Sequence, residues 1–409
     1  MNIAILLPYK ENFSLKSAGA VSIFVNDTNQ LSIFKKNITV YGSTEDRFTL
    51  KNYINVSLKK KIFLSTSTQY IKKFISLVKD NEINILEVHN RPNYIDYLDK
   101  FFICKKILYF HNDPQDMQGS KSVAERINLL NKTDKIIFNS NWSKLRFLES
   151  LPHSLNFDKI NVIHQSTSKV KINFKKKKKI ISFVGKLNSS KGYDAFGEAI
   201  LKILRKYPNW KSIVIGDEPR EKLNFKHKNL NHLGYKDNPY ILNKLKEVSI
   251  SVVPSKWDEP FGRSSLEAAS RGSALIISNT GGLRETTNDA VIINNVTAKN
   301  IYKKIDYLIK NKKFRQDLQK SAYKNFKLTN QRSSKLIDNL RSEFHLKTLN
   351  NRLNVDKILK IVHITNFNER FDGRLHYNTG KRINNGFVRL GHNVLTISDR
   401  DIVSNYKSI

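Results

Sequence analysis

The sequence predicts an α/β fold, with two Rossmann-like, doubly wound domains that face a cleft and a partial third α/β unit after them. Three observations predict it. Short apolar runs alternate with longer amphipathic stretches, and the alternation restarts near residue 180. The runs are rich in β-branched and aromatic residues and almost continuously apolar, which is typical of parallel strands buried on both faces. A chain of 409 residues is long enough for about two to three domains.

The N-terminal domain is predicted over residues 1–168. Its amphipathic stretches include residues 65–79 and 120–131. Its expected strands are IAILLP (3–8), NITVYG (37–42), NILEVHN (84–90), ILYFHN (107–112), KIIFNS (135–140) and INVIHQ (160–165).

A basic linker is predicted over residues 169–179, and a C-terminal domain over residues 180–345. Residues 311–344 are helical in pattern and are expected to pack behind this domain. The other expected helices are 194–206, 239–247, 264–271 and 298–310. The expected strands are 180–186, 212–217, 231–235, 249–255, 274–279 and 290–295. Ligands bind at the carboxyl ends of parallel strands, so we expect a binding cleft between the two domains.

A second linker, 346–356, precedes a partial α/β unit over residues 357–409. The pattern is one strand (358–365), one helix near residues 380–390 and one strand (393–399). So short a segment cannot complete a doubly wound domain. We favour the opening of a further α/β domain, and the alternative is a piece that docks on the rest of the chain.

The cysteine count and the apolar runs indicate the cellular compartment. The single cysteine, Cys104, excludes an intrachain disulfide and fits a reducing compartment. The first apolar run is expected to be a strand and not a signal peptide, and no run of eighteen apolar residues predicts a membrane span, so a cytoplasmic location is expected.

The formal net charge of +35 would suit nucleic acid or an anionic membrane. Lysines occur in strands, helices and loops alike, which favours a compositional bias with solvated faces. The alternative is a basic surface that contacts the inner face of the cell membrane peripherally.

The segment VVPSKWDEPFGRSSLEAASRG (252–272) contains the first candidate site residues. Glu259 is expected on a loop after a strand, and Glu267 about one turn inside the following helix. Both carboxylates can then face one crevice and accept hydrogen bonds from sugar hydroxyls. The N–H groups of Phe261 and Gly262, at the helix entrance, favour a phosphate. Considered alone, the two glutamates could equally be an ordinary loop charge and a surface helix residue.

The loop FVGKLNSSKG (183–192) contains the second group. Gly185 allows a tight turn after a strand, and Lys186 and Lys191 can flank a diphosphate as point charges. In a lysine-rich protein the same loop could be an ordinary strand-to-helix connection. In the first half, Gly19 is expected at a strand-to-helix turn, and His111 at a strand end facing the cleft, where it could move a proton or be a structural histidine.

Several functional motifs do not occur in the sequence. It has no CxxC or HExxH motif and no His/Asp cluster with metal-ligand spacing, so no metal site is predicted. It has no P-loop, GxGxxG fingerprint or GxSxG elbow. No RNA-binding aromatic motif occurs, and nucleic acid is not an expected partner.

Taken together, these segments resemble the retaining glycosyltransferases of family four (glycosyl transferases group 1), which have the GT-B architecture. The resemblance covers about residues 1–345, and residues 381–401 resemble the start of a second such domain. It implies that residues 1–168 form the acceptor-side domain and that residues 180–345 form the donor-binding domain. The segments that carry it, in chain order, are FNSNWSKLRF (138–147), GKLNSSKG (185–192), EPFGRSSLE (259–267) and SNTGGLRE (278–285).

The resemblance implies that this chain moves a hexose from a nucleotide sugar, in UDP or GDP form, to a glycan or lipid-linked acceptor. It further implies retention of anomeric configuration, no cofactor or metal beyond the donor, and a place in surface polysaccharide or lipopolysaccharide synthesis. The implied site residues are Lys186 and Lys191 at the diphosphate with Gly185 and Gly19, Glu267 at the ribose, Glu259 with Phe261 and Gly262 at the sugar, His111 near the reacting carbon, and Gly234 and Tyr235 at the base.

Two departures and three alternatives accompany this reading. Lys186 stands where the family often has arginine, which loses bidentate geometry, and Ala18-Gly19 replaces the usual glycine pair. The alternatives are a sugar phosphorylase, an epimerase, or a non-catalytic basic α/β module that binds nucleic acid or membrane.

Overall fold

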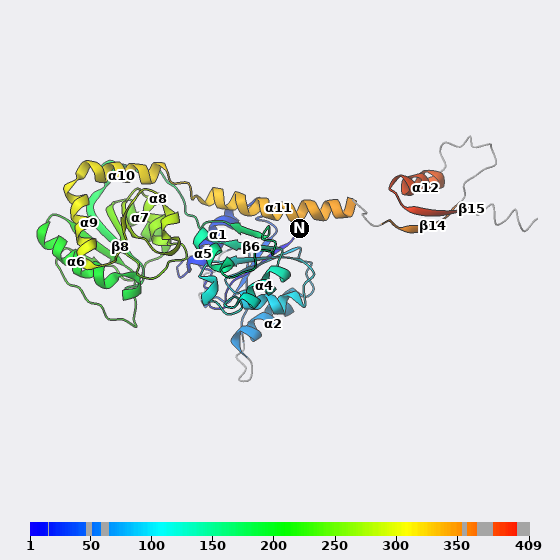
Figure 1. Ribbon diagram of the computed structural model, residues 1–409, viewed down its shortest axis with the longest axis horizontal. Helices are drawn as coiled ribbons and strands as arrows, with labels where there is room; N and C mark the ends of the chain where they lie inside the picture. Colours follow the sequence, from blue (N-terminus) through cyan, green and yellow to red (C-terminus); the bar gives the residue numbers. More distant parts are fainter. Residues whose placement is uncertain (15, 46–50, 59–64, 354–357, 366–378, 399–409) are drawn as a thin grey trace, which may run out of the picture. The chain divides into compact units, whose positions relative to one another are not determined.

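The structure is a computed structural model that describes residues 1–14, 16–45, 51–58, 65–353, 358–365 and 379–398, with the backbone alone for 345–353. The chain divides into two compact units, Met1–Arg341 and Ser342–Ile409, and each is described by itself. The first unit contains two parallel sheets with helices around them (Figure 1). The predicted fold class is therefore confirmed.

The N-terminal sheet has seven parallel strands in the order β3-β2-β1-β4-β5-β6-β7. The order reverses direction at β1, as in a doubly wound sheet. The strands are β1 (Ile3–Leu6), β2 (Ile38–Gly42), β3 (Tyr53–Asn55), β4 (Ile85–His89), β5 (Lys105–Phe110), β6 (Lys135–Phe138) and β7 (Ile160–Val162). The helices are α1 (Ala20–Leu31), α2 (Thr66–Val78), α3 (Ile95–Asp99), α4 (Val123–Lys132) and α5 (Asn141–Leu148), with short 3-10 turns at Pro92–Tyr94 and Pro114–Asp116.

The C-terminal sheet has six parallel strands in the order β10-β9-β8-β11-β12-β13. The strands are β8 (Lys178–Val184), β9 (Lys211–Ile215), β10 (Leu230–His232), β11 (Val248–Val253), β12 (Ala274–Ser278) and β13 (Ala290–Ile293). The helices are α6 (Tyr193–Lys206), α7 (Asn238–Leu245), α8 (Arg263–Ser270), α9 (Ala298–Lys310) and α10 (Lys312–Lys324), with 3-10 turns η3 (Phe174–Lys176), η4 (Ser189–Lys191) and η5 (Gly281–Thr286).

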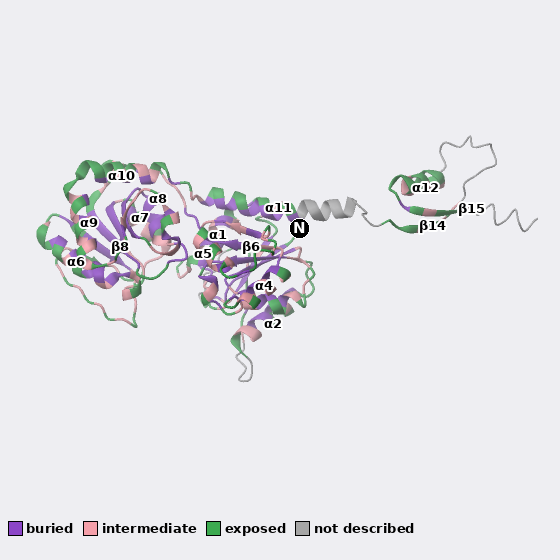
Figure 2. Ribbon diagram, in the orientation of Figure 1, coloured by how far each residue is buried: buried purple, intermediate pink, exposed green. Residues whose placement is uncertain are grey.

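Both sheets have apolar cores made by their central strands and the inner faces of their helices. Figure 2 shows buried strands inside each sheet and exposed outer helix faces. Strand β12 is fully buried along its length, and β4 is buried on both faces, which explains their nearly continuous apolar sequences.

Helix α11 (Asn330–Leu353) packs on the N-terminal sheet, which differs from the prediction that residues 311–345 belong to the C-terminal domain. Arg341 forms a two-bond ion pair with Glu87 on β4, at 2.7 and 2.9 Å, and both side chains are 2% exposed or less. Asp338 accepts from the Ser32 hydroxyl at 2.6 Å. Helical periodicity identified the helix, but it carries no information on which sheet the polar face would meet.

The predicted linkers contain regular structure. Residues 169–179 include η3 and the start of β8, and α11 continues to Leu353, inside the predicted linker 346–356. The second unit has the predicted element order. Strands β14 (Lys360–Thr365) and β15 (Asn393–Ser398) pair in parallel, with α12 (Thr379–Arg389) between them in sequence. Its described part leaves Ile358, Val362 and Leu390 more than half exposed. The resemblance over 381–401 extends outside the described residues at its end.

Among the residues that the structure describes, no helix combines the length and the apolarity that crossing a bilayer requires.

Candidate functional site

A cavity of about 620 Å³ lies between the two sheets of the first unit. Residues that follow β5, β6 and β7 line one side of it, and residues that follow β8 and β11 line the other, so it lies at the carboxyl ends of both sheets. The lining residues are Ala20, His111, Asn112, Asn139, Gln165, 183–186, Asn188, Ser190, Lys191, Arg220, 253–255, Trp257 and 259–264.

Glu259 lies in the cavity wall on the loop between β11 and α8, and it is only 8% exposed. Its Oε1 lies 2.6 Å from Nζ of Lys191, which comes from the loop after β8. The same ammonium group lies 4.9 Å from the centre of the Trp257 ring. The two loops that the sequence singled out are therefore joined at this point by an ion pair.

The backbone of Glu259 is held by the Gly-Gly turn at the start of η5. The N–H of Gly282 donates to the Glu259 carbonyl at 2.7 Å. Gly281 has φ of +52°, and a Cβ there would collide with the Glu259 backbone. The GG pair in SNTGGLRE is thus required by the close approach of two loops.

The N-terminus of α8 faces the cavity. Gly262 precedes the helix with φ of +103°, and a Cβ there would collide with Leu283. Phe261 lies beside it, 1% exposed. The first N–H groups of a helix have no intrahelical acceptor, and the helix dipole favours an anion near them. This geometry suits a phosphate group.

Glu267 is buried one turn inside α8 and is not among the residues that line the cavity. Its Oε1 accepts from Nδ2 of Asn238 at 2.6 Å and lies 2.9 Å from Nε of Arg263. Burial raises the pKa of Glu267, and the Arg263 guanidinium and the Asn238 amide oppose that rise. Both contacts are to Oε1, so Oε2 has no hydrogen bond to the described residues.

The loop after β8 brings Gly185, Lys186 and Lys191 to the cavity. Gly185 has φ of +150°, and Lys186 is exposed. Asn188 accepts from the Lys191 N–H at 3.0 Å and so fixes the η4 turn that carries Lys191. Gly192 ends this turn in the left-handed conformation, where a Cβ would collide with the carbonyl of Pro254.

His111 lines the cavity, as predicted, but both of its ring nitrogens already have protein partners. Nε2 lies 3.0 Å from Nδ1 of His89, and Nδ1 lies 3.3 Å from Nε2 of Gln165. Burial, the His89 ring and the Arg263 guanidinium hold the pKa of His111 well below its ordinary value. The imidazole is therefore neutral near pH 7, and its orientation is set from within the N-terminal sheet.

Like Glu267, the predicted residues Gly19 and Tyr235 are not brought into the cavity wall. Gly19 precedes α1, where the carboxylate of Glu11 lies against it and accepts from the Ser22 N–H at 3.1 Å. An internal carboxylate thus occupies the helix N-terminus that was expected to meet a phosphate. Tyr235 is 54% exposed, and its hydroxyl reaches the Lys16 carbonyl at 3.4 Å.

The sequence reasoning missed several residues that line the cavity, chiefly Arg263, Asn139 and Gln165. Arg263 lies within the segment EPFGRSSLE, where only the glutamates, Phe261 and Gly262 were singled out. Asn139 and Gln165 follow β6 and β7, and their position at strand ends was a usable signal.

Glu285 joins the two sheets at one end of the cavity region. Its carboxylate accepts from the backbone N–H groups of Asn141 and Trp142 at 2.7 and 2.9 Å, and lies 2.9 Å from Nε2 of His164. Although burial raises the pKa of Glu285, these hydrogen bonds bring it below its ordinary value. The Glu285 side chain, from the C-terminal domain, therefore caps the N-terminus of α5 in the N-terminal domain.

The charges of the cavity favour an anionic ligand. Lys186, Lys191, Arg220 and Arg263 line it, against Glu259 alone among carboxylates. Over the described ranges, no group of three or more His, Cys, Asp or Glu side chains is arranged to hold a metal ion.

Fold and site together define a two-domain α/β protein with a cationic cleft at the carboxyl ends of both sheets. Residues 164–325 match the family model described as glycosyl transferases group 1, so this segment is a domain of that family. It contains β8 to β13, the two loops joined by the Lys191–Glu259 pair, and α8.

Curated relatives match parts of the chain. An uncharacterized glycosyltransferase of Methanocaldococcus jannaschii is 31% identical over 36% of this chain and 40% of its own length. A glycogen synthase of Mycobacterium tuberculosis is 32% identical over 25% of this chain and 26% of its own length. The chain thus spans well under two thirds of these relatives.

Solved structures match most of the chain at low identity. Sucrose-phosphate synthase from Thermosynechococcus elongatus has a TM-score of 0.67 at 14% identity, covering 85% of this chain and all of that one. A glycosyltransferase from Rickettsia africae has a TM-score of 0.66 at 18% identity, covering 84% and 98%. HepE from Anabaena, in complex with UDP and glucose, has a TM-score of 0.64 at 14% identity, covering 84% and 99%. The fold is that of the GT-B glycosyltransferases.

Proposed function

We propose that this chain is a retaining glycosyltransferase that moves a hexose from a nucleoside-diphosphate sugar to a glycan or lipid-linked acceptor. The observation that carries the proposal is the Lys191–Glu259 pair at the N-terminus of α8, inside a cleft whose other charges are cationic. Cations and helix N–H groups favour a diphosphate, and a buried carboxylate suits sugar hydroxyls. The family match over residues 164–325 supports the same assignment.

Several of the predicted residues then have distinct tasks. Lys186, Lys191 and the α8 N-terminus neutralise the leaving diphosphate, which is electrostatic stabilisation without a metal. Glu259 accepts from hydroxyls of the transferred sugar, and the free Oε2 of Glu267 accepts from the donor ribose. The neutral His111 imidazole, held by His89 and Gln165, lies near the reacting carbon.

Three relatives bear on the choice of donor and pathway. The solved structure of HepE is a complex with UDP and glucose, and WaaG is a glycosyltransferase involved in lipopolysaccharide biosynthesis. A curated relative is encoded in a cps region of Klebsiella pneumoniae. We propose a UDP- or GDP-linked donor and a role in cell-surface polysaccharide or lipopolysaccharide synthesis. We place this step in the cytoplasm.

A thermal-shift panel of UDP, GDP, ADP and their sugars tests donor binding. One ligand series should raise the melting temperature, because a ligand at 100 times its Kd stabilises the native state by about 2.7 kcal/mol. Glu267→Ala should weaken binding of that nucleotide roughly 10- to 100-fold, since a hydrogen bond to a charged group is lost. Normal affinity in Glu267→Ala would count against the assigned ribose contact, and no shift with any nucleotide would refute the proposed function.

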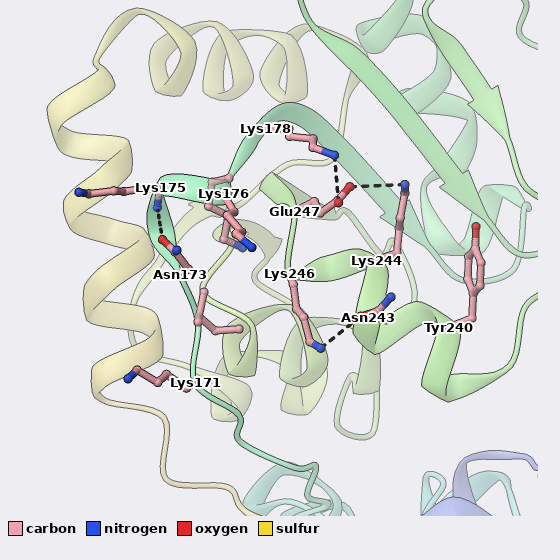
Figure 3. A pocket seen from close by; sticks show the side chains of 12 residues that line it. Lys171, Asn173, Lys175, Lys176, Lys178, Tyr240, Asn243, Lys244, Lys246 and Glu247 are labelled. Carbon is pink, nitrogen blue, oxygen red and sulfur yellow. Dashed lines mark hydrogen bonds and ion pairs between the residues drawn. The ribbon is translucent and has the colours of Figure 1, made fainter.

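We also propose that the acceptor side of the reaction takes place at an anionic membrane, which this chain contacts through a lysine-lined hollow. The hollow has a volume of about 740 Å³ and is lined by the residues before β8 and the end of α7 (Figure 3). Its lysines are Lys171, Lys175, Lys176, Lys177, Lys178, Lys244 and Lys246, against one carboxylate, Glu247.

The contacts of the lysines in this hollow favour a membrane surface, and not a small molecule, as the binding partner. Glu247 pairs with Lys178 at 2.9 Å and with Lys244 at 3.6 Å, whereas Lys171, Lys175 and Lys176 form no ion pair within the described residues. Exposed, unfixed ammonium groups suit the diffuse charge of a bilayer. Lys177 instead anchors the segment, because its ammonium donates to the Leu245, Val248 and Arg271 carbonyls.

The triple variant Lys171→Glu, Lys175→Glu and Lys176→Glu should lose roughly 100-fold or more in affinity for vesicles that contain phosphatidylglycerol, since each basic residue near an anionic surface contributes about 1 kcal/mol. Vesicle sedimentation measures the effect. The control reverses Lys299, Lys303 and Lys313, three exposed lysines on α9 and α10. Equal binding of wild-type protein to phosphatidylcholine vesicles, or an unchanged triple variant, would contradict membrane contact.

A further inference from the structure

Arg263 is a charged side chain in the cleft whose nitrogens have no hydrogen-bond partner. Its side chain is 13% exposed, and Nε, Nη1 and Nη2 are all buried. A guanidinium carries five N–H donors. Leaving such donors buried and unmet costs more than leaving a neutral group unmet. A side chain in this state indicates that a ligand supplies the missing acceptors.

Two carboxylates near Arg263 hold its charge but do not satisfy its donors. Oε1 of Glu267 lies 2.9 Å from Nε as an ion pair, without a directed hydrogen bond. Asp27 on α1 interacts with Arg263 electrostatically, but its carboxylate accepts from Asn330 at 3.0 Å. The contact with Glu267 therefore orients the guanidinium and leaves Nη1 and Nη2 available.

The surroundings of Arg263 point to a phosphate. It is the first residue of α8 and lines the same cavity as Lys186 and Lys191. Both lysines are point charges, whereas a guanidinium offers paired donors in a plane that matches phosphate oxygens. The α8 N-terminus adds N–H groups on the same side.

We propose that Arg263 is a further donor-binding residue, oriented by Glu267, whose two terminal nitrogens bind the diphosphate of the nucleotide sugar. This inference rests on the proposed function. Asn238 holds Glu267 independently at 2.6 Å, so the ribose contact stays in place when Arg263 is replaced. The loss on replacing Arg263 should therefore depend on the phosphates of the ligand.

The test compares Arg263→Met and Arg263→Lys with wild-type protein by calorimetry. The probes are UDP, GDP and ADP, and the nucleoside of whichever diphosphate binds. Arg263→Met should weaken diphosphate binding roughly 10- to 100-fold, the range for a charged hydrogen bond, and change nucleoside binding much less. Arg263→Lys should recover part of the loss, because it keeps the charge without the paired donors. Arg205→Met, at an exposed site on α6, is the matched control.

An Arg263→Met variant that binds the diphosphate with wild-type affinity would overturn the inference. Equal losses for the diphosphate and the nucleoside would also overturn it, because the arginine would then act on the ribose through Glu267. Wild-type protein that binds none of the three diphosphates would refute the proposed function itself. Circular dichroism of each variant separates lost binding from lost folding.

Discussion

Glu259→Gln should lower the turnover of the nucleotide sugar roughly 10²- to 10³-fold, the cost of removing one preorganised electrostatic group from an active site. The carboxylate is 8% exposed and lies 2.6 Å from Lys191, in a cleft where its charge is weakly screened. The amide keeps the size and one hydrogen-bond acceptor but removes the charge that stabilises a positively charged sugar in the transition state. Release of nucleoside diphosphate from the donor measures the effect.

Glu259→Gln should change the affinity for the free nucleoside diphosphate far less than the turnover, because Glu259 is assigned to the sugar. Glu198→Gln, on the exposed face of α6, is the matched control and should keep wild-type turnover. A Glu259→Gln enzyme with near-normal turnover would remove Glu259 from the mechanism.

Arg341→Met should destabilise the N-terminal domain by about 3–5 kcal/mol, since removal of one partner leaves a charge buried and unpaired. Glu87 is 1% exposed on β4, and Arg341 provides both of its ion-pair hydrogen bonds. The midpoint of urea unfolding, followed by circular dichroism, measures the loss. The double variant Arg341→Met with Glu87→Leu should recover part of it, because the Glu87 charge is no longer buried without a partner, while the Asp338 carboxylate keeps its hydrogen bond from Ser32.

The pH dependence gives a second readout of the same pair. Burial opposes ionisation of Glu87, yet the Arg341 guanidinium brings its pKa from 4.5 to about 2. A carboxyl with a lowered pKa stabilises the fold above its unfolded pKa and loses that effect as pH falls through the folded value. The stability difference between wild-type protein and Arg341→Met should therefore shrink as pH falls from about 4.5 toward 2. A constant difference over this range would contradict the assignment.

Much of the fold could be predicted because buried parallel strands have continuous apolar sequences. Twelve of the thirteen strands in the two large sheets overlap an expected run, and β3 (Tyr53–Asn55) is the exception. Its three residues include two exposed ones, so no apolar run marks it. Helix α11 was expected behind the wrong sheet, since its partners Glu87 and Ser32 lie more than 250 residues away in sequence.

Candidate site residues could be predicted from the sequence where a strand end, a turn and a helix start lie within one short segment. Glu259, Phe261 and Gly262 lie in the cavity wall because a strand end, a turn and a helix start follow one another in EPFGRSSLE. Gly19 was expected beside a phosphate, but its helix N-terminus is filled by Glu11, eight residues earlier. No spacing rule shows that an internal carboxylate will cap a helix in this way. The role of Arg263 could not be predicted from the sequence either, because only the positions of the surrounding side chains show that its N–H donors lack acceptors.

Ligand protection of individual lysines tests the central claim, that the cleft binds a nucleotide-sugar donor, most directly. The protein is treated with an amine-reactive reagent with and without saturating UDP-, GDP- or ADP-sugar, and modification is followed by mass spectrometry. The account predicts that one donor slows modification of Lys186 and Lys191, while Lys171, Lys175 and Lys176 react as before. Unchanged modification of Lys186 and Lys191 with every donor, or protection confined to the lysine-lined hollow, would contradict it.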